Sequence, residues 1–198
     1  LVYGRPQEVS THLIGSEVIR KISFTGSTPV GKALLGLAAA GVKRATMELG
    51  GHAPVLVFDD VDPVQAARQA VVAKFRNAGQ VCTSPTRFYV QEGIYERFVA
   101  AFAEAAGQLR VGDGLDPQTQ VGPLANERRV HAMQALVADT RASGARLLCG
   151  GERPALPGWF FQPTVFADVP ESARIMNEEP FGPIVPIAPF RPLEDGIA

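Results

Sequence analysis

The chain has 198 residues, enough for one sizeable domain or for one domain with part of a second. Hydrophobic residues make up 46% of it, charged residues make up 20%, and the formal net charge is only −1. This composition is ordinary for a globular protein, and since Lys and Arg are spread along the chain, no basic patch indicates nucleic-acid binding and no block of like charge indicates a tail. We therefore expect no nucleic-acid partner and, since no apolar run reaches the ~18 residues of a membrane helix, no membrane partner.

The elements predicted before Gly51 form a strand–helix–strand fragment. They are a strand over 18–25, a helix over about 29–40 and a strand over 44–49. Pro29 suits the first turn of the helix, which Ser27 or Thr28 can cap. The composition shifts at Gly50 and Gly51, so we predict two domains, residues 1–50 and 51–198.

The elements predicted after Gly51 alternate between short apolar runs and longer amphipathic ones, which favours an α/β fold. The apolar run 53–58 predicts a strand buried on both faces. The other predicted strands are 87–91, 145–149, 163–166 and 184–190, and the predicted helices are 63–77, 95–109 and 126–143. The chain starts at Leu1 rather than Met, and Leu193–Ala198 looks like a helix that stops as it starts, so we expect a piece of a longer protein.

Cys82 is the first candidate for chemistry. It follows a predicted helix end in Asn77-Ala-Gly-Gln-Val-Cys82, and small neighbours leave room for a substrate. The alternative is a small buried apolar residue, which is how we interpret Cys149. Two cysteines are too few for a disulfide framework, which favours a reduced cytoplasmic compartment. A thiol nucleophile needs a proton acceptor, and no histidine supplies an obvious one, so a carboxylate is the better partner.

Four motifs in a fixed order resemble the aldehyde dehydrogenase superfamily. They are Phe24-Thr-Gly-Ser-Thr28, Met47-Glu-Leu-Gly-Gly51, Gly79-Gln-Val-Cys82 and Glu178-Glu-Pro-Phe-Gly-Pro183. Within that superfamily, Lys74-Phe-Arg-Asn-Ala-Gly-Gln80 resembles the succinate-semialdehyde dehydrogenase group. The resemblance implies a three-layer α/β catalytic domain with a parallel sheet, incomplete at its C-terminus. The last part of a Rossmann-like nucleotide-binding domain would precede it.

The resemblance also implies an activity and a site. The family oxidises aldehydes to carboxylic acids with NAD or NADP, here from succinate semialdehyde or a related semialdehyde, in a homodimer or homotetramer and without a metal. Cys82 matches the nucleophile and Glu48 the general base. The positions that match cofactor contacts are Gly26, Ser27, Gly31, Leu49, Glu179 and Phe181. Arg76 matches an arginine that holds the substrate's distal carboxylate.

Several alternatives stay open from the sequence. Arg76 also fits a cation at a helix C-terminus, Phe181 fits core packing, Glu48 fits a solvated carboxylate, and residues 24–31 fit an ordinary strand-to-helix turn. The competing functions are oxidation of a different aliphatic aldehyde, a cysteine-dependent acyl transferase or esterase, and a non-catalytic protein. By resemblance, the oxyanion asparagine and most of the cofactor site lie outside this chain, so we expect the chain alone to be inactive.

Overall fold

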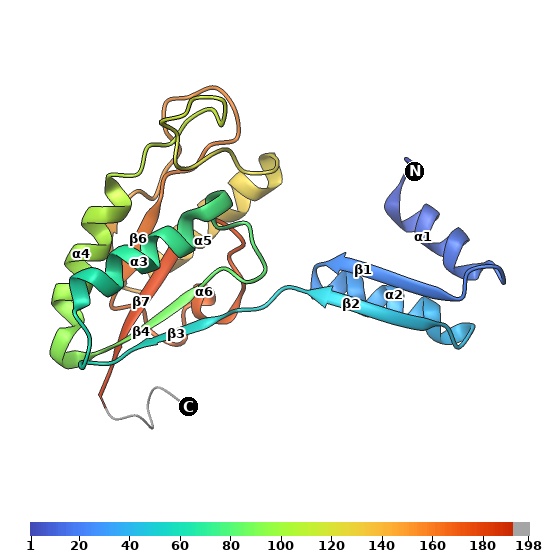
Figure 1. Ribbon diagram of the computed structural model, residues 1–198, viewed down its shortest axis with the longest axis horizontal. Coiled ribbons are helices and arrows are strands. Elements are labelled where there is room, and N and C mark those ends of the chain that lie inside the picture. The colour runs from blue at the N-terminus through green and yellow to red at the C-terminus, as the bar shows by residue number, and fades with distance from the viewer. Residues whose placement is uncertain (192–198) are drawn as a thin grey trace. The chain divides into compact units, whose positions relative to one another are not determined.

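The computed structural model describes residues 1–191, and the chain forms two compact units that divide after Gly51 (Figure 1). The division lies one residue beyond the boundary that we placed in the sequence. The assignment of the units to nucleotide binding and catalysis stays a prediction. The helix start expected at 193–198 lies outside the described residues. No helix within residues 1–191 has both the length and the apolar character needed to cross a membrane.

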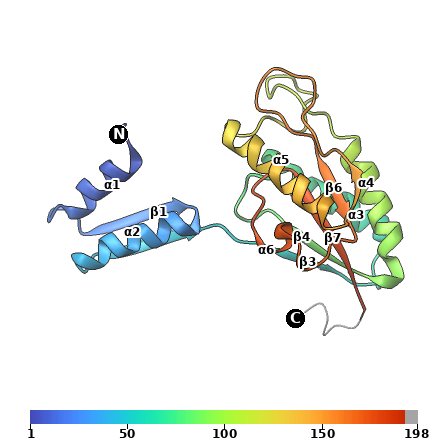
Figure 2. The same cartoon turned by 180° about the vertical axis from the view of Figure 1, so that it is seen from behind.

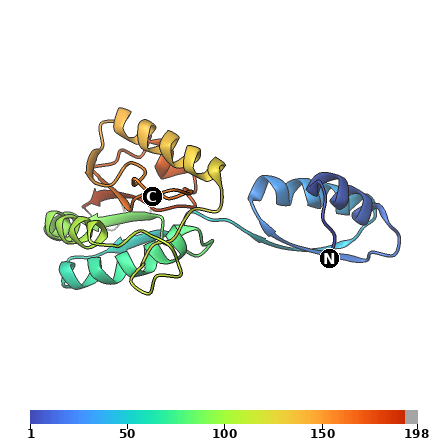
Figure 3. The ribbon, with the colours of Figure 1, turned by 90° about the horizontal axis from the view of Figure 1, so that it is seen from above.

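The first unit is a two-stranded parallel sheet covered by helices (Figure 3). Its elements are α1 (Pro6–Gly15), β1 (Lys21–Gly26), α2 (Thr28–Ala40) and β2 (Arg44–Leu49). The predicted strand–helix–strand order is confirmed, although β1 begins later than expected. α1 was not predicted, and Ile14 is its only buried residue. Ser27 is the N-cap of α2, but its side chain forms no cap hydrogen bond within the described residues.

The second unit is built on a five-stranded sheet with the order β3-β4-β7-β6-β5. The strands are β3 (Pro54–Val57), β4 (Arg87–Gln91), β5 (Arg146–Cys149), β6 (Thr164–Ala167) and β7 (Ile184–Phe190). All neighbours are parallel except β5, which runs antiparallel to β6. The central strand β7 is almost wholly buried, as its apolar run requires. The expected α/β fold with a largely parallel sheet is confirmed.

Helices cover both faces of this sheet and complete the three layers (Figures 2 and 3). One face carries α3 (Pro63–Phe75) and α4 (Tyr95–Gly107), and the other carries α5 (Glu127–Ala142) and α6 (Arg174–Asn177). Short 3-10 turns, η1 (Arg76–Gly79) and η2 (Glu92–Ile94), follow α3 and β4. Aromatic side chains of α4 pack on the sheet, with the Phe102 ring 5.2 Å from that of Phe88 on β4.

Two expectations about this unit are wrong. The run 53–58 is not buried on both faces, because β3 is the edge strand of the sheet and Pro54 is exposed. The helix predicted to reach Asn77 ends at Phe75, because the following residues turn into the left-handed region. That early end matters for function, since it sets the path of the chain toward Cys82.

Candidate active site

Two motifs that lie about one hundred residues apart in the sequence precede neighbouring strands of the sheet, at the same end of these strands. The Cys82 turn leads into β4, and the segment 178–183 leads into β7, the parallel neighbour of β4. Phe88 pairs with Ile187, and Cys82 and Phe181 each stand six residues before these partners. The topology therefore brings the cysteine motif and the Glu-Glu-Pro-Phe-Gly-Pro motif together at the amino-terminal ends of β4 and β7.

A left-handed turn carries the chain from α3 toward Cys82. Asn77, Ala78 and Gly79 have φ angles of 51°, 54° and 71°. Such angles are uncommon for residues with a side chain and concentrate at functional sites. A Cβ atom on Gly79 would lie 2.3 Å from the carbonyl oxygen of Gly182, so only glycine fits there. The two motifs are thus in direct backbone contact.

Hydrogen bonds hold this turn on both sides of the cysteine. The Gln80 side chain accepts from the Ala125 N–H at 2.8 Å and donates to the Pro123 carbonyl at 3.3 Å. The Ser84 hydroxyl donates to the Lys74 carbonyl at 3.3 Å, which ties the far side of the turn back to α3. Cys82 is exposed between these anchors. The alternative of a buried apolar cysteine is therefore wrong for Cys82.

Cys149 has the opposite environment. It is half-buried at the end of β5, and its Sγ lies 3.7 Å from the Pro163 carbonyl oxygen. Burial raises the pKa of its thiol, which disfavours the reactive thiolate. Its interpretation as a packing residue is supported.

Helix α5 braces the segment before β7. The Arg129 guanidinium donates to the carbonyl oxygens of Pro180 and Phe181, the latter at 3.3 Å. A Cβ on Gly182 would lie 2.3 Å from Met133 Sδ, so this backbone also packs tightly on α5. Phe181 is half-buried with a φ of 41°, another left-handed residue. These contacts fix the loop that carries the predicted nicotinamide-side positions.

Charged groups lie beneath these loops. Lys74 is fully buried, and burial lowers the pKa of its ammonium to about 7 while the attraction of Glu179 opposes that shift. Burial also lowers the pKa of Arg129, again against the attraction of Glu179. Glu179 itself is half-buried. The predicted ribose-binding carboxylate therefore interacts with two cations of its own unit.

The sequence analysis missed Lys74 and Arg129 as parts of the site. Lys74 continues the helical spacing of Ala67 and Val71, the buried stripe of α3. A lysine at a core position of an amphipathic helix is the signal that could have found it. Arg129 gives no such signal, because α5 carries further arginines with the same local pattern.

His52 has a packing role. Its ring nitrogens lie 2.7 Å from Thr86 Oγ1 and 2.9 Å from the Ile175 carbonyl oxygen. Burial lowers the pKa of the imidazole to about 4, so the ring stays neutral near pH 7. This agrees with our interpretation that His52 is not the acid–base partner of a thiol.

Arg76 lies in the same unit as Cys82 and is exposed. We predicted that Arg76 lies in the last turn of the helix, and this is wrong: it is the C-cap residue of α3 and has an extended backbone. Because the C-cap lies at the C-terminus of α3, the alternative of a helix C-terminal cation stays open. Its contact with a substrate carboxylate stays a prediction.

The remaining predicted residues belong to the first unit. Gly26 ends β1, Ser27 caps α2, and the exposed Glu48 and half-buried Leu49 end β2. A Cβ on Gly31 would lie 2.7 Å from Leu49 Cδ2, so this glycine lets α2 approach the sheet closely. The proximity of Glu48 to Cys82 stays a prediction.

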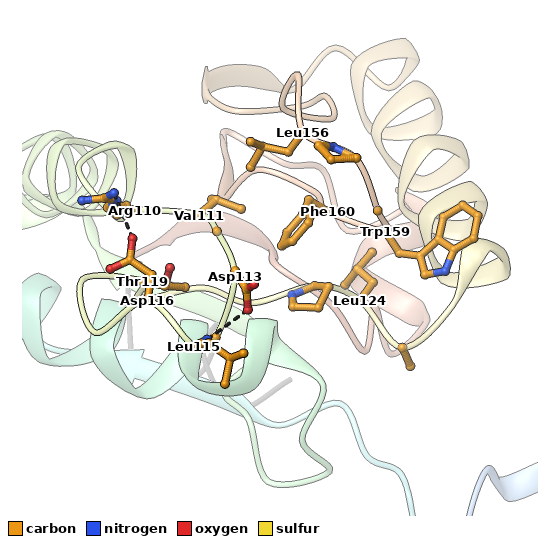
Figure 4. A pocket seen from close by; sticks show the side chains of 16 residues that line it. Arg110, Val111, Asp113, Leu115, Asp116, Thr119, Leu124, Leu156, Trp159 and Phe160 are labelled. Carbon is orange, nitrogen blue, oxygen red and sulfur yellow. Dashed lines mark hydrogen bonds and ion pairs between the residues drawn. The ribbon is translucent and has the colours of Figure 1, made fainter.

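A separate hollow in the second unit has a volume of about 1010 Å³ (Figure 4). It lies between the loops 110–119 and 156–160, and Phe160 and Leu156 point toward it. Neither Cys82 nor Glu179 lines it. Within residues 1–191, no cluster of three or more histidine, cysteine or acidic side chains could hold a metal.

Comparison with known proteins agrees with this geometry. The chain is 50% identical over all 198 residues to a 4-(hydroxymethyl)benzenesulfonate dehydrogenase of Comamonas testosteroni and covers 41% of it. It is 46% identical over 190 residues to a 3-sulfolactaldehyde dehydrogenase of Pseudomonas putida, with 96% of this chain and 39% of that protein covered. It is 43% identical over 198 residues to the NADP-dependent succinate-semialdehyde dehydrogenase of Escherichia coli K12, with 100% and 41% covered. The chain thus spans about 40% of the length of these relatives.

Solved structures give the same result. The fold matches an aldehyde dehydrogenase of Pseudomonas syringae, solved with NAD+ and octanal, at a TM-score of 0.96 and 37% identity over 100% of this chain and 41% of that one. It matches a succinate-semialdehyde dehydrogenase of Burkholderia pseudomallei at 0.94 and 42%, over 98% and 40%. The family model for aldehyde dehydrogenases matches residues 1–198 from end to end. This chain belongs to the aldehyde dehydrogenase family.

Proposed function

We propose that the protein containing this chain oxidises an aldehyde to a carboxylic acid with NAD or NADP, using Cys82 as its nucleophile. The observation that carries the proposal is the exposed Cys82 on a turn in backbone contact with the loop of Glu179 and Phe181. A cysteine-dependent hydrolase would need the nucleophile but has no use for that second loop. The named activities of the relatives add support.

The chemistry needs a thiolate and a base. The Cys82 thiolate attacks the carbonyl carbon and forms a thiohemiacetal. When bound, the nicotinamide cofactor accepts the hydride that leaves this carbon, and a thioester remains on Cys82. Glu48 then takes a proton from water, whose oxygen attacks the thioester and releases the carboxylic acid and the thiol. The assignment of Glu48 rests on its place in the Glu-Leu-Gly-Gly motif.

In each unit, the residues that match the family motifs are assigned contacts with a dinucleotide. At the start of α2, free backbone N–H groups and the helix dipole favour a phosphate beside Gly26 and Ser27. Gly31 and Leu49 set the close approach of that helix to its sheet. On the nicotinamide side, Glu179 would accept hydrogen bonds from ribose hydroxyls, and the half-buried Phe181 ring would border the nicotinamide.

For the substrate, we propose a semialdehyde with a distal carboxylate, first of all succinate semialdehyde. Arg76 is exposed, stands six residues before Cys82 in the sequence and carries a permanent charge. Two relatives are named for substrates with a sulfonate and another for succinate semialdehyde, all of them anionic. A sulfonate-bearing aldehyde is therefore the second candidate, since a guanidinium binds either anion.

The test is a steady-state comparison in the full-length protein of succinate semialdehyde, an aldehyde sulfonate and propanal, each with NAD and NADP. Cys82→Ala should abolish reduction of the cofactor, whereas the matched variant Cys149→Ala should keep it. Retained turnover in Cys82→Ala would remove the proposed nucleophile.

The role of Arg76 needs its own comparison. Arg76→Met should raise the KM of the anionic aldehydes by about tenfold or more, the worth of one charge-assisted hydrogen bond, and leave propanal unchanged. Arg68→Met, which removes an exposed arginine from the same helix, is the control. Equal effects on charged and uncharged aldehydes would contradict a carboxylate-binding role.

A further inference from the structure

Lys74 is the most unusual buried group in the described part of the chain. It is fully buried in the core stripe of α3, among the largest side chains with no exposure. A buried ammonium is costly unless an opposite charge compensates it. Its Nζ atom has no hydrogen-bond partner within residues 1–191. Such a residue calls for an explanation beyond packing.

The position of the ammonium gives that explanation. Lys74 Nζ lies 3.4 Å from the place where a Gly79 Cβ would stand, and the same place is 2.3 Å from the Gly182 carbonyl oxygen. The ammonium therefore sits at the junction of the cysteine turn and the loop before β7. The backbone carbonyl of Lys74 also accepts a hydrogen bond from the Ser84 hydroxyl. Lys74 therefore lies against the cysteine turn with both its backbone and the tip of its side chain.

The charge of Lys74 is compensated from the second loop. Glu179 attracts the ammonium and keeps its pKa at about 7 against the effect of burial. Two other titratable groups lie close by. Glu179 also attracts the guanidinium of Arg129, and the charge of Lys74 contributes to the lowered pKa of His52. The Lys74–Glu179 interaction thus connects α3 with the loop before β7.

We propose that Lys74 is a positioning residue that orients the Glu179 carboxylate for the nicotinamide ribose. The inference rests on the proposed function, because it assigns the ribose contact to Glu179. Lys74 acts on the cofactor site only through Glu179. Removing it loosens the cofactor and leaves Cys82 in place.

The test is a double-mutant cycle on cofactor binding in the full-length protein, measured by calorimetry as the Kd of NAD or NADP. Lys74→Met and Glu179→Gln should each raise the Kd by about tenfold, and the double variant should be no worse than either single one. Glu178→Gln, which removes the neighbouring exposed carboxylate that pairs with Arg174 instead, is the matched control. Combined with Lys74→Met, this control should change nothing further.

A second set of measurements distinguishes a positioning role of Lys74 from a purely structural one. The KM of the aldehyde and the alkylation rate of Cys82 without cofactor should be unchanged in Lys74→Met. Lys74→Gln, which keeps a polar head group, replaces Met in the cycle if the Met variant does not fold. Additive effects of Lys74 and Glu179 overturn the inference while the dehydrogenase function stands. An unchanged Kd in Glu179→Gln would contradict both the ribose contact of Glu179 and the inference about Lys74. The dehydrogenase function is tested separately, by the loss of turnover in Cys82→Ala.

Discussion

The contact between Gly79 and Gly182 can be tested with a single methyl group. In Gly79→Ala the new Cβ would stand 2.3 Å from the Gly182 carbonyl oxygen and 2.8 Å from its carbonyl carbon. Both are backbone atoms, and ordinary contact begins near 3.4 Å, so one of the two loops must move by about 1 Å. The φ of 71° adds a cost of about 1–2 kcal/mol for any residue with a Cβ.

A displacement of about 1 Å at a reacting centre can lower the rate by about 10²-fold. We therefore expect kcat/KM of the full-length Gly79→Ala enzyme to fall by about two orders of magnitude, measured by cofactor reduction well below the unfolding temperature. Gly122→Ala is the control, because no atom lies within 4 Å of its Cβ position. A Gly79→Ala enzyme with a kcat/KM within about twofold of the wild type would refute the argument that this contact sets the site.

Three further changes test the buried groups around the site. Burial lowers the pKa of Lys74 from 10.5 to about 7. Between about pH 7 and 10.5 the unfolded chain therefore binds this proton more tightly than the folded one. The cost of burying the charge to the folding free energy is full below about pH 7 and decreases as the pH rises. The stability of Lys74→Met relative to the wild type should therefore fall by about 3 kcal/mol from about pH 6 to about pH 9, measured by thermal melts; a pH-independent difference contradicts this. Tyr95→Phe removes a hydroxyl that donates to Asp168 Oδ1 and accepts from the Asp168 N–H, both at 2.8 Å, and should lower the unfolding free energy by about 1–3 kcal/mol in thermal melts. Arg129→Met removes the donor to the loop before β7 and should raise the cofactor Kd by about tenfold, whereas the exposed Arg128→Met should not.

Much of the fold could be predicted because local signals and burial agree. Asp62 and Pro63 start α3 as expected, with the Asp62 carboxylate accepting from the Val64 N–H at 2.9 Å. The run Ile184–Phe190 is the strand that its apolar pattern indicates. The errors occur where tertiary position decides. Whether 53–58 lies at the edge or the centre of a sheet depends on strand order, which no local pattern encodes.

The site was predictable only in part. Cys82 and Phe181 were found by their motifs, and strand pairing explains why they share an edge. The left-handed path through Asn77 and Ala78 was not predicted, because neither residue type requires a positive φ. The roles of Lys74 and Arg129 depend on contacts with a loop far away in sequence, so they become visible only once the chain is folded.

Most residues of the second unit that have a strained, left-handed backbone lie where the two loops touch. Among residues 52–191, the left-handed residues with side chains are Asn77, Ala78 and Phe181, all in the two touching loops, and Asp168, whose N–H donates to the Tyr95 hydroxyl. Each costs about 1–3 kcal/mol and persists only where surrounding contacts determine it. The buried sheet, the Gln80 bridge and the Arg129 brace supply those contacts. Because the two loops meet at Gly79 and Gly182, movement of one must displace the other, so the positions of Cys82 and of the loop that carries Glu179 are set together.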